Sequence, residues 1–422
     1  MTQDPRRSTF KGSVLIESGR ITRILTSDQG LTCNEIPADS ETLDIEGAVL
    51  VPALINGHYH LGETIFRSKA DGLDLAAYLD LSHNSYLDSR WYEHRQRIHS
   101  LSAHIALLEA ARQGVGTVCV SRGWEEVRAL GLCSVSCYPV IRVRKLEDLY
   151  ASFDADFARI YERYHSQQVR VGIFVQSLST VDDEKLLAIS GWLREKNDVM
   201  LVIHVSETRS EVEKLRSERG MSPFQLLDRL GLLGPRTVCV HCVHVDERDL
   251  DLIAERKPGL VLCPVANLKL GDGIPPVRLL TETGAPVAAG TDGLATNNSA
   301  SVLESAKLCA LLGRLSAQRA FDLVTTGAAD VLKLPRQGRI EVGAEASVAV
   351  FRPYRSSAQP WSASNILSHL VFNFAGFLLE TLIVQGRKVI WRGEMVAADE
   401  GRLVAQFQAM QAEMERAETE DV

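Results

Sequence analysis

The sequence lacks the long basic runs and the long apolar stretches that mark several classes of protein. Its 422 residues carry 46 Lys and Arg against 54 Asp and Glu, a formal net charge of −8. An acidic balance without a Lys/Arg run argues against a nucleic-acid-binding surface. No stretch approaches the length of a membrane span, and no apolar segment follows the first residues as in a secretion signal. We therefore expect a cytoplasmic protein that binds neither nucleic acid nor membrane.

The sequence also lacks the cysteine pattern expected of a disulfide framework or of a site of four thiolates. The eight cysteines lie mostly in apolar runs, where a free thiol behaves as a small hydrophobe. Cys239 and Cys242 form a C-x-x-C inside a β-like run (238–245), whereas a redox motif of this kind opens a helix. No second C-x-x-C completes a zinc site. We predict structural thiols.

The order of the predicted elements indicates an α/β fold. The middle of the chain alternates short apolar runs (117–120, 169–175, 199–203, 237–240, 260–262 and 286–289) with helix-like segments (101–113, 183–195, 209–219, 246–256 and 301–313). Such alternation predicts parallel β/α units, and the apolar runs predict strands buried on both faces. The number of units fits a (β/α)₈ TIM-like barrel. A doubly wound sheet fits less well because no Gly-rich phosphate fingerprint follows a strand.

Both ends of the chain have β character and are expected to pair. Short β segments separated by Gly, Ser and Asp turns occupy residues 12–51, and residues 346–351 and 381–384 look similar. Residues 17–20 have the composition of a hairpin turn. We predict a small β-sandwich domain from 1–52 with 339–397, a barrel from 53–338, and a helical tail over 398–422.

Two histidines mark the end of the first barrel strand. His58 and His60 follow an apolar stretch, and side chains two residues apart on a strand point the same way. Two imidazoles on one face are half of a divalent metal site. An H-x-H pair alone also arises by chance, so the remaining ligands must come from elsewhere in the chain.

The other predicted strands supply further ligand types at their ends. The run 199–203 ends in His204, 237–240 ends in His241, and 286–289 leads through Gly290 and Thr291 to Asp292. The carboxyl ends of barrel strands form the active site in this architecture. Each histidine alone would more often be structural, but the combination predicts a metal site. Glu207, three residues after His204, is either a proton-exchanging carboxylate or an acid in the first turn of the next helix.

These segments together resemble the amidohydrolase superfamily. The resemblance rests on VPALINGHYH (51–60), HVSET (204–208), VHCVH (240–244), CPVANLKLG (263–271) and AGTDG (289–293), and spans about residues 12 to 396. It is closest to the branch of S-adenosylhomocysteine/methylthioadenosine deaminases, guanine and cytosine deaminases, and triazine hydrolases. The motifs are specific to the superfamily and much less specific to one substrate.

The resemblance implies a role for each matching position. His58, His60, His204 and Asp292 would bind one divalent metal per chain, with Zn²⁺ favoured and Fe²⁺ the alternative. His241 would contact the attacking water or the substrate, Glu207 would shuttle protons, and Asp292 would take the proton of the water. No Lys follows a strand where a carboxylated lysine would bridge two metals, which favours one metal.

The expected reaction is hydrolytic deamination of an amino-substituted heterocycle, such as a purine, pterin, pyrimidine or modified nucleoside, by hydroxide that the metal generates from water. The substrate is a small molecule, and we expect a homodimer or larger homo-oligomer.

The chain departs from the adenosine-type members in two places, which argues against a simple nucleoside substrate. Residues 173–180 lack the histidine, associated with ribose contact, and the prolines of the equivalent adenosine-type segment, and Tyr78 stands where a tryptophan is expected. Gln176, Tyr78, Arg142 and Asn267 are the predicted substrate contacts. The alternative function is removal of chloride, alkylamine or an amide nitrogen at the same site. A metal-free binding protein on this fold is a more distant alternative, because such proteins typically lose ligands.

Overall fold

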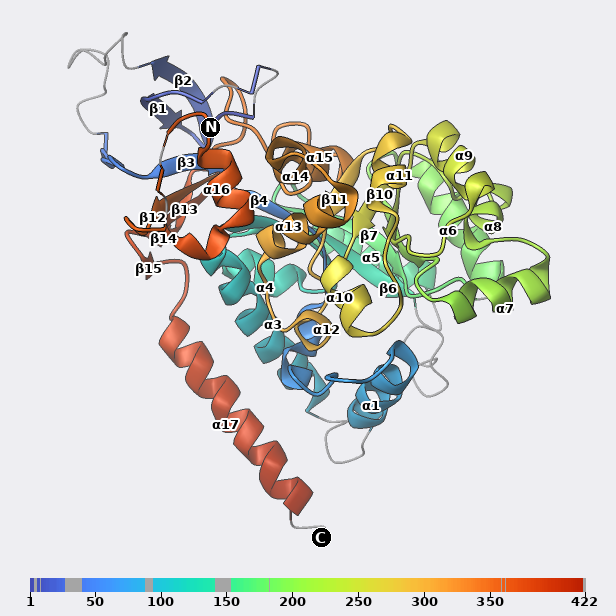
Figure 1. Cartoon of the computed structure of the whole chain (residues 1–422). Helices are drawn as coiled ribbons and strands as arrows, with labels where there is room; N and C mark the ends of the chain where they lie inside the picture. Colours follow the sequence, from blue (N-terminus) through green and yellow to red (C-terminus); the bar gives the residue numbers. More distant parts are fainter. Residues whose placement is uncertain are drawn as a thin grey trace.

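A computed structural model describes residues 1–3, 6–7, 9–26, 40–87, 94–140, 153–181, 183–357, 359–360 and 362–419, with the side chains of 83–87, 153–154 and 417–419 excepted. Eight strands form one parallel sheet in chain order (Figure 1). They are β4 (Leu54–Tyr59), β5 (Val115–Ser121), β6 (Cys133–Val140), β7 (Val169–Val175), β8 (Leu201–Val205), β9 (Thr237–His241), β10 (Gly259–Leu262) and β11 (Val287–Ala289). The predicted (β/α)₈ barrel is confirmed.

Helices follow the strands and cover the outside of the sheet (Figure 1). They are α3 (Arg95–Arg112), α4 (Trp124–Ala129), α5 (Phe153–Tyr164), α6 (Asp183–Glu195), α7 (Arg209–Arg219), α8 (Pro223–Arg229), α9 (Glu247–Arg256), α11 (Val277–Glu282), α13 (Val302–Gly313), α14 (Ala317–Asp322) and α15 (Thr326–Val331). Local sequence explains their ends. In α7 the Thr208 side chain caps the first turn, and Gly220 ends the helix at φ 70°. In α9, Asp246 and Asp249 form a capping box.

Further helices lie in the loops at the carboxyl ends of the strands. η1 (Leu61–Phe66) and α1 (Leu75–Leu87) follow β4, α10 (Pro264–Lys269) follows β10, and α12 (Leu294–Asn297) follows β11. Phe66 and Tyr78 from the first loop pack with Leu270 and Ala295 into a small apolar cluster of their own. The loops therefore form a packed layer over that end of the barrel.

The first and last barrel strands meet at a seam made by polar groups. The backbone N–H groups of Thr291 and Asp292 donate to the His58 carbonyl at 3.2 and 3.1 Å. The buried Asn56 side chain accepts from the N–H groups of His58 and Thr291, and donates to the Thr291 hydroxyl at 2.7 Å. Gly57 allows a close approach here, because a Cβ atom would lie 3.0 Å from the Ala289 carbonyl oxygen.

Strands from both chain ends lie together, as predicted. β3 (Val49–Pro52), β12 (Val348–Pro353), β13 (Phe377–Val384), β14 (Arg387–Trp391) and β15 (Glu394–Met395) form an antiparallel sheet in the order β15-β14-β13-β12-β3. β1 (Gly12–Glu17) and β2 (Arg20–Thr26) form a hairpin whose turn has positive φ at Ser18 and Gly19. Ile21 from the hairpin packs with Val348 in a shared apolar cluster. The division into three parts at residues 52, 338 and 397 remains our proposal.

The C-terminal part differs from the expected all-β character. Residues 366–372 form α16 (Ile366–Phe372), followed by the 3-10 helix η3 (Phe374–Gly376). Ile366, Leu370 and Val371 recur at helical spacing and are buried, and α16 contacts α13 and α14. This helix was not predicted, because its short helical period lies between two β-like runs.

The C-terminal helix α17 (Glu400–Thr419) extends from the sheet along α3 (Figure 1). Met410 of α17 is buried, and Arg97 of α3 pairs with Glu413 at 2.9 Å.

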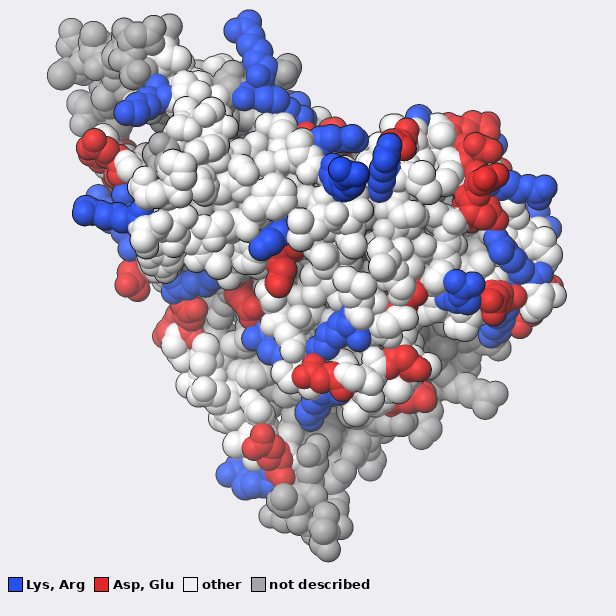
Figure 2. All heavy atoms as spheres, in the orientation of Figure 1, with Lys and Arg blue, Asp and Glu red and all other residues white. Residues whose placement is uncertain are grey.

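The described residues include no helix that is both long enough and apolar enough to cross a bilayer. On the face seen in Figure 2, Lys and Arg side chains lie interspersed with Asp and Glu, around a wide area without charged side chains. The seven described cysteines are free and buried, in agreement with the predicted structural thiols, and Cys33 lies outside the described residues.

Candidate metal centre and active site

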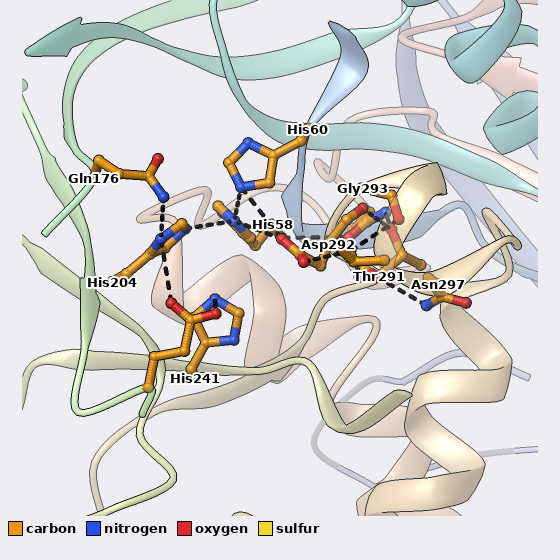
Figure 3. Close-up of polar contacts among 12 residues, drawn as sticks. His58, His60, Gln176, His204, His241, Thr291, Asp292, Gly293 and Asn297 are labelled. Atoms are coloured by element: carbon orange, nitrogen blue, oxygen red, sulfur yellow. Dashed lines mark hydrogen bonds and ion pairs between the residues drawn. The ribbon is translucent and has the colours of Figure 1, made fainter. Parts of the chain in front are cut away.

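Four side chains from three strands converge at the carboxyl end of the barrel. His58 lies on β4, His60 directly after it, His204 on β8, and Asp292 after β11 (Figure 3). The Nε2 atom of His58 is 3.0 Å from Nε2 of His60 and 3.1 Å from Nε2 of His204. Asp292 Oδ1 is 3.4 and 3.2 Å from the same atoms of His58 and His60. The potential ligand atoms all lie within 4.8 Å of one another, which suits one divalent cation.

The protonation of this cluster also fits a cation. Burial lowers the pKa of His58 to about 4 and that of His204 well below its ordinary value, so both offer a lone pair. Burial alone would lower the pKa of His60, but the carboxylates of Glu63 and Asp292 raise it to about 9. The same carboxylates favour positive charge at this point of the site, as a cation would supply.

Neighbouring groups orient the carboxylate of Asp292. The Thr296 hydroxyl donates to its Oδ2 at 2.6 Å, which leaves Oδ1 facing the histidines. Burial would raise the pKa of Asp292, but hydrogen bonds with His58 and His60 hold it well below its usual range. The backbone is strained at this point: Asp292 has φ 61° and His241 has φ 75°, values that are uncommon outside glycine. Backbone strain of this kind is typical of residues at functional sites.

Glu207 and His241 form a second layer beside the cluster. Glu207 Oε1 lies 3.3 Å from Nε2 of His241, and Oε2 lies 3.7 Å from Nδ1 of His204. Burial, followed by the carboxylates of Asp272 and Asp292, raises the pKa of Glu207 well above its ordinary value. A buried carboxyl with a raised pKa keeps its proton to higher pH than an exposed one and is able to donate it. Glu211 fixes the Glu207 backbone by accepting from its N–H at 3.1 Å.

Two of the predicted substrate contacts are hydrogen-bonded to site histidines. The Gln176 amide nitrogen, directly after β7, lies 3.2 Å from Nδ1 of His204 (Figure 3). The Asn267 amide nitrogen lies 3.0 Å from Nδ1 of His241 and 3.2 Å from Asp272 Oδ2, and Asn267 is fully buried. Both side chains therefore contact the Nδ1 atom of a site histidine. Their predicted contact with substrate stays a prediction.

The other two predicted contacts differ in what the structure shows. Tyr78 is buried in the loop layer, where its hydroxyl faces the Glu63 carboxylate. Arg142 lies outside the described residues.

Three residues near the site were not predicted from the sequence. Glu63 lies one turn after His60, and its Oε2 is buried with no hydrogen-bond partner. Thr296 and Asp272 were also missed, because nothing in their local sequence connects them to the strand ends.

Comparison with known proteins identifies the family. The model of the amidohydrolase family matches residues 49–389, which include every residue of the cluster. The chain belongs to the amidohydrolase family.

Full-length relatives within the family carry deaminase names. The 5′-deoxyadenosine deaminase of Methanothermobacter thermautotrophicus is 32% identical, with 96% of this chain and 95% of the relative covered. The 5-methylthioadenosine/S-adenosylhomocysteine deaminase of Desulforudis audaxviator is 30% identical, with 94% of each chain covered. The resemblance drawn from the strand-end motifs is thereby confirmed.

Solved structures agree with the fold. An adenosine deaminase from Xanthomonas campestris with bound zinc has a TM-score of 0.86 at 23% identity, covering 96% of this chain and 94% of that one. A zinc-bound atrazine chlorohydrolase from Arthrobacter aurescens has a TM-score of 0.86 at 21% identity, covering 97% of each chain. At these identities the likeness establishes the shared barrel architecture alone.

Proposed function

We propose that this amidohydrolase is a metal-dependent aminohydrolase that removes an amino group, as ammonia, from a heterocyclic small molecule. The observation that carries the proposal is the buried cluster of His58, His60, His204 and Asp292 with Glu207 beside it. A cation site next to a carboxyl that holds a proton combines the two elements that hydrolysis of a C–N bond on an electron-poor ring requires.

We propose one Zn²⁺ per chain as the metal, with Fe²⁺ as the alternative. Three imidazoles and one carboxylate are the nitrogen and oxygen donors that zinc accepts in hydrolytic sites. The second group of potential ligands, His204, Glu207 and His241, shares His204 with the first, so it does not add an independent site. When bound, the cation acts as a Lewis acid that makes water nucleophilic near neutral pH.

The chain's own residues would then move protons and stabilise charge. Asp292, held ionised by His58 and His60, accepts the proton of the attacking water. Glu207, which holds its proton when buried, donates to the ring nitrogen beside the carbon under attack, and the ring carbon becomes tetrahedral. His241, with Nε2 facing Glu207, stabilises the developing charge on the oxygen. The amino group leaves as ammonia with the proton that Asp292 took from the water. The hydroxyl proton passes to Glu207 as the carbonyl forms, which restores both carboxyl groups to their starting states.

The names of the relatives narrow the range of candidate substrates. Those that are 30–32% identical over nearly the whole chain are named for 5′-deoxyadenosine and for 5-methylthioadenosine or S-adenosylhomocysteine. We therefore place adenine nucleosides altered at the 5′ position first among candidate substrates. Gln176 and Tyr78 still depart from the adenosine-type pattern, so other aminated purines and pterins come next.

The test is a screen for ammonia release from aminated heterocycles, with metal content measured on the same sample. We expect about one metal per chain and ammonia from at least one adenine nucleoside. Asp292→Asn should abolish turnover, whereas Asp228→Asn, which removes a surface partner of Arg256, should not. Substantial activity in Asp292→Asn would contradict the proton route. Protein purified without chelator that contains less than about 0.2 metal per chain would instead favour a metal-free binding protein.

The second candidate function changes only the leaving group. Removal of chloride or an alkylamine from a triazine would release no ammonia, so chloride and amine assays on the same panel separate the two. The likeness to the atrazine chlorohydrolase lies in the fold, so no residue contact favours this candidate. Cytoplasmic location and a homo-oligomer remain proposals, and the oligomer is tested by light scattering after gel filtration.

A further inference from the structure

The geometry points to Asn267 and Asp272 as a positioning pair that fixes which ring nitrogen of His241 carries the proton. This inference rests on the proposed function for its catalytic meaning. The contact itself is a property of the folded chain. We propose that the pair holds His241 as the neutral tautomer protonated on Nε2, so that the ring is a hydrogen-bond donor toward the site and not a metal ligand.

The first step of the argument is the orientation of the Asn267 amide. Its nitrogen lies 3.2 Å from the Asp272 carboxylate and 3.0 Å from Nδ1 of His241. An ionised carboxylate only accepts hydrogen bonds, so the amide must present N–H to Asp272. The same nitrogen carries a second hydrogen, and that hydrogen points at His241. The reversed amide would place its oxygen against the carboxylate, which is repulsive.

The second step follows from the ring. Since Asn267 donates to Nδ1 of His241, that nitrogen must hold its lone pair, and a neutral imidazole then carries its proton on Nε2. Burial lowers the pKa of His241 to about 3, which agrees with a neutral ring. Nε2 is buried and lies 3.3 Å from Glu207 Oε1 without hydrogen-bond geometry. Its N–H therefore faces the place where an oxygen of the reacting molecule would lie.

The third step is that Asp272 is itself held in place from two sides. Its backbone N–H donates to the Asn267 carbonyl at 2.9 Å. Its own carbonyl accepts from Nε2 of His244 at 2.7 Å, which explains the second histidine of the VHCVH segment. Asp272 is only slightly exposed and Asn267 not at all. A rigid arrangement of this kind has little freedom to let the amide rotate.

A protonated Nε2 has a chemical consequence for the metal. The nitrogen has no lone pair to give a cation, so His241 is excluded from coordination although it lies within 4.8 Å of His204 and Glu207 ligand atoms. The pair thereby separates the three ligand histidines, whose Nε2 atoms face one another, from a fourth that donates a hydrogen bond. Preorganised donors aimed at a developing negative charge contribute strongly to catalysis.

The tautomer is measured directly by ¹⁵N NMR of the full chain loaded with Zn²⁺ and labelled at histidine nitrogens. The spectra are taken at pH 8, above the pKa of about 6 to which burial raises Asp272. We expect His241 to be protonated on Nε2 in the wild type. In Asn267→Asp an oxygen faces Nδ1, so the proton should move to Nδ1. Asp272→Asn keeps an acceptor oxygen for Asn267 and should retain the wild-type tautomer.

Kinetics with a heterocycle that the wild type deaminates provide the second readout. Asn267→Asp should lower kcat by about 10²–10³-fold, the effect of losing one donor to the developing oxyanion, with a much smaller change in KM. Asp272→Asn should lower kcat less than Asn267→Asp, and its loss should come from Glu207, whose pKa the Asp272 carboxylate helps to raise. An Asp272→Asn protein with the proton of His241 on Nδ1 would mean that the acceptor oxygen does not orient the Asn267 amide, and the positioning role would be wrong.

Asn297→Asp is the matched control, because Asn297 is also buried beside the site but donates to the Thr291 carbonyl. It should leave the His241 tautomer unchanged, and an equal shift would show that any nearby carboxylate has the effect. Metal content should match the wild type in all three variants. A wild-type His241 protonated on Nδ1 overturns the proposal whether or not any heterocycle is deaminated. Absence of turnover with the predicted tautomer present overturns only the proposed function.

Discussion

Replacing Gln176 by leucine should weaken metal binding although Gln176 is not among the proposed ligands. Its amide nitrogen lies 3.2 Å from Nδ1 of His204, and Nε2 of the same ring faces His58 across 3.1 Å. Coordination through Nε2 requires the proton on Nδ1, so the Gln176 amide must rotate to present its oxygen to Nδ1–H when metal binds. The Asn267 amide differs, because the Asp272 carboxylate holds its nitrogen toward His241. Such a partner fixes the tautomer and the ring orientation and raises the basicity of the ligand.

The expected size of the effect follows from this single contact. Loss of an outer partner of a ligating histidine costs about 10–100-fold in metal affinity. The change in binding free energy is about 1.4–2.7 kcal/mol, since each tenfold corresponds to about 1.4 kcal/mol. Gln176→Glu places an ionised acceptor against Nδ1–H and should bind metal at least as tightly as the wild type. Leucine and glutamate at this one position should therefore have different effects on metal affinity.

The measurement is the dissociation constant for Zn²⁺, from competition with a chromogenic chelator. Gln168→Leu is the control, because the Gln168 amide donates to the Leu132 carbonyl at 3.0 Å, before the start of β7 and at the opposite end of that strand. Its metal affinity should equal that of the wild type. If Gln176→Leu binds metal normally and instead raises KM, Gln176 contacts substrate, and the reasoning from His204 is refuted.

Further changes test the rest of the site and the seam. Glu207→Gln should keep its metal but lose about 10²–10⁴-fold in kcat as a general acid is removed, and metal analysis showing an empty site would make Glu207 a ligand. Stripping the metal should lower the free energy of unfolding by about 2.7 kcal/mol relative to protein at free metal 100-fold above Kd, measured by calorimetry; equal stability with and without metal would argue against a folded-state site. Asn56→Leu leaves the N–H groups of His58 and Thr291 without their side-chain acceptor, so urea titration should show a loss of about 2–6 kcal/mol, at about 1–3 kcal/mol for each unpaired group. A loss well under 1 kcal/mol would mean that the seam does not depend on Asn56.

The barrel and the histidine–aspartate cluster were predictable because they depend on short-range periodicity. Alternation of side chains along a strand places His58 and His60 on one face, and the strand-end rule for barrels brings His204 and Asp292 to the same end. These two regularities do not depend on the paths of the loops. The predicted cluster was therefore independent of the structure of the connecting segments.

The partners of the site were not predictable, for a physical reason that is visible in the loops. Asp272 reaches Asn267 only because the chain turns after α10, and Glu63 reaches the Asp292 region only because η1 folds back over the strand end. The path of a loop is set by packing against other loops, and that information is not local. The contact between Gln176 and His204 was not predicted for the same reason: a polar residue after a strand points either into a pocket or across to the next strand.

The seam between β4 and β11 has a consequence for how the protein matures. Asn56 and Thr291, whose side chains join there, are 235 positions apart in the chain. Contacts of such long range form late, after the intervening units have folded. A nascent chain that has emerged only as far as β8 holds the three proposed ligand histidines but not Asp292, so it lacks the full ligand set. Uptake of the ion is therefore tied to completion of the ring, and loading with metal would report that biosynthesis and folding of the whole barrel are finished.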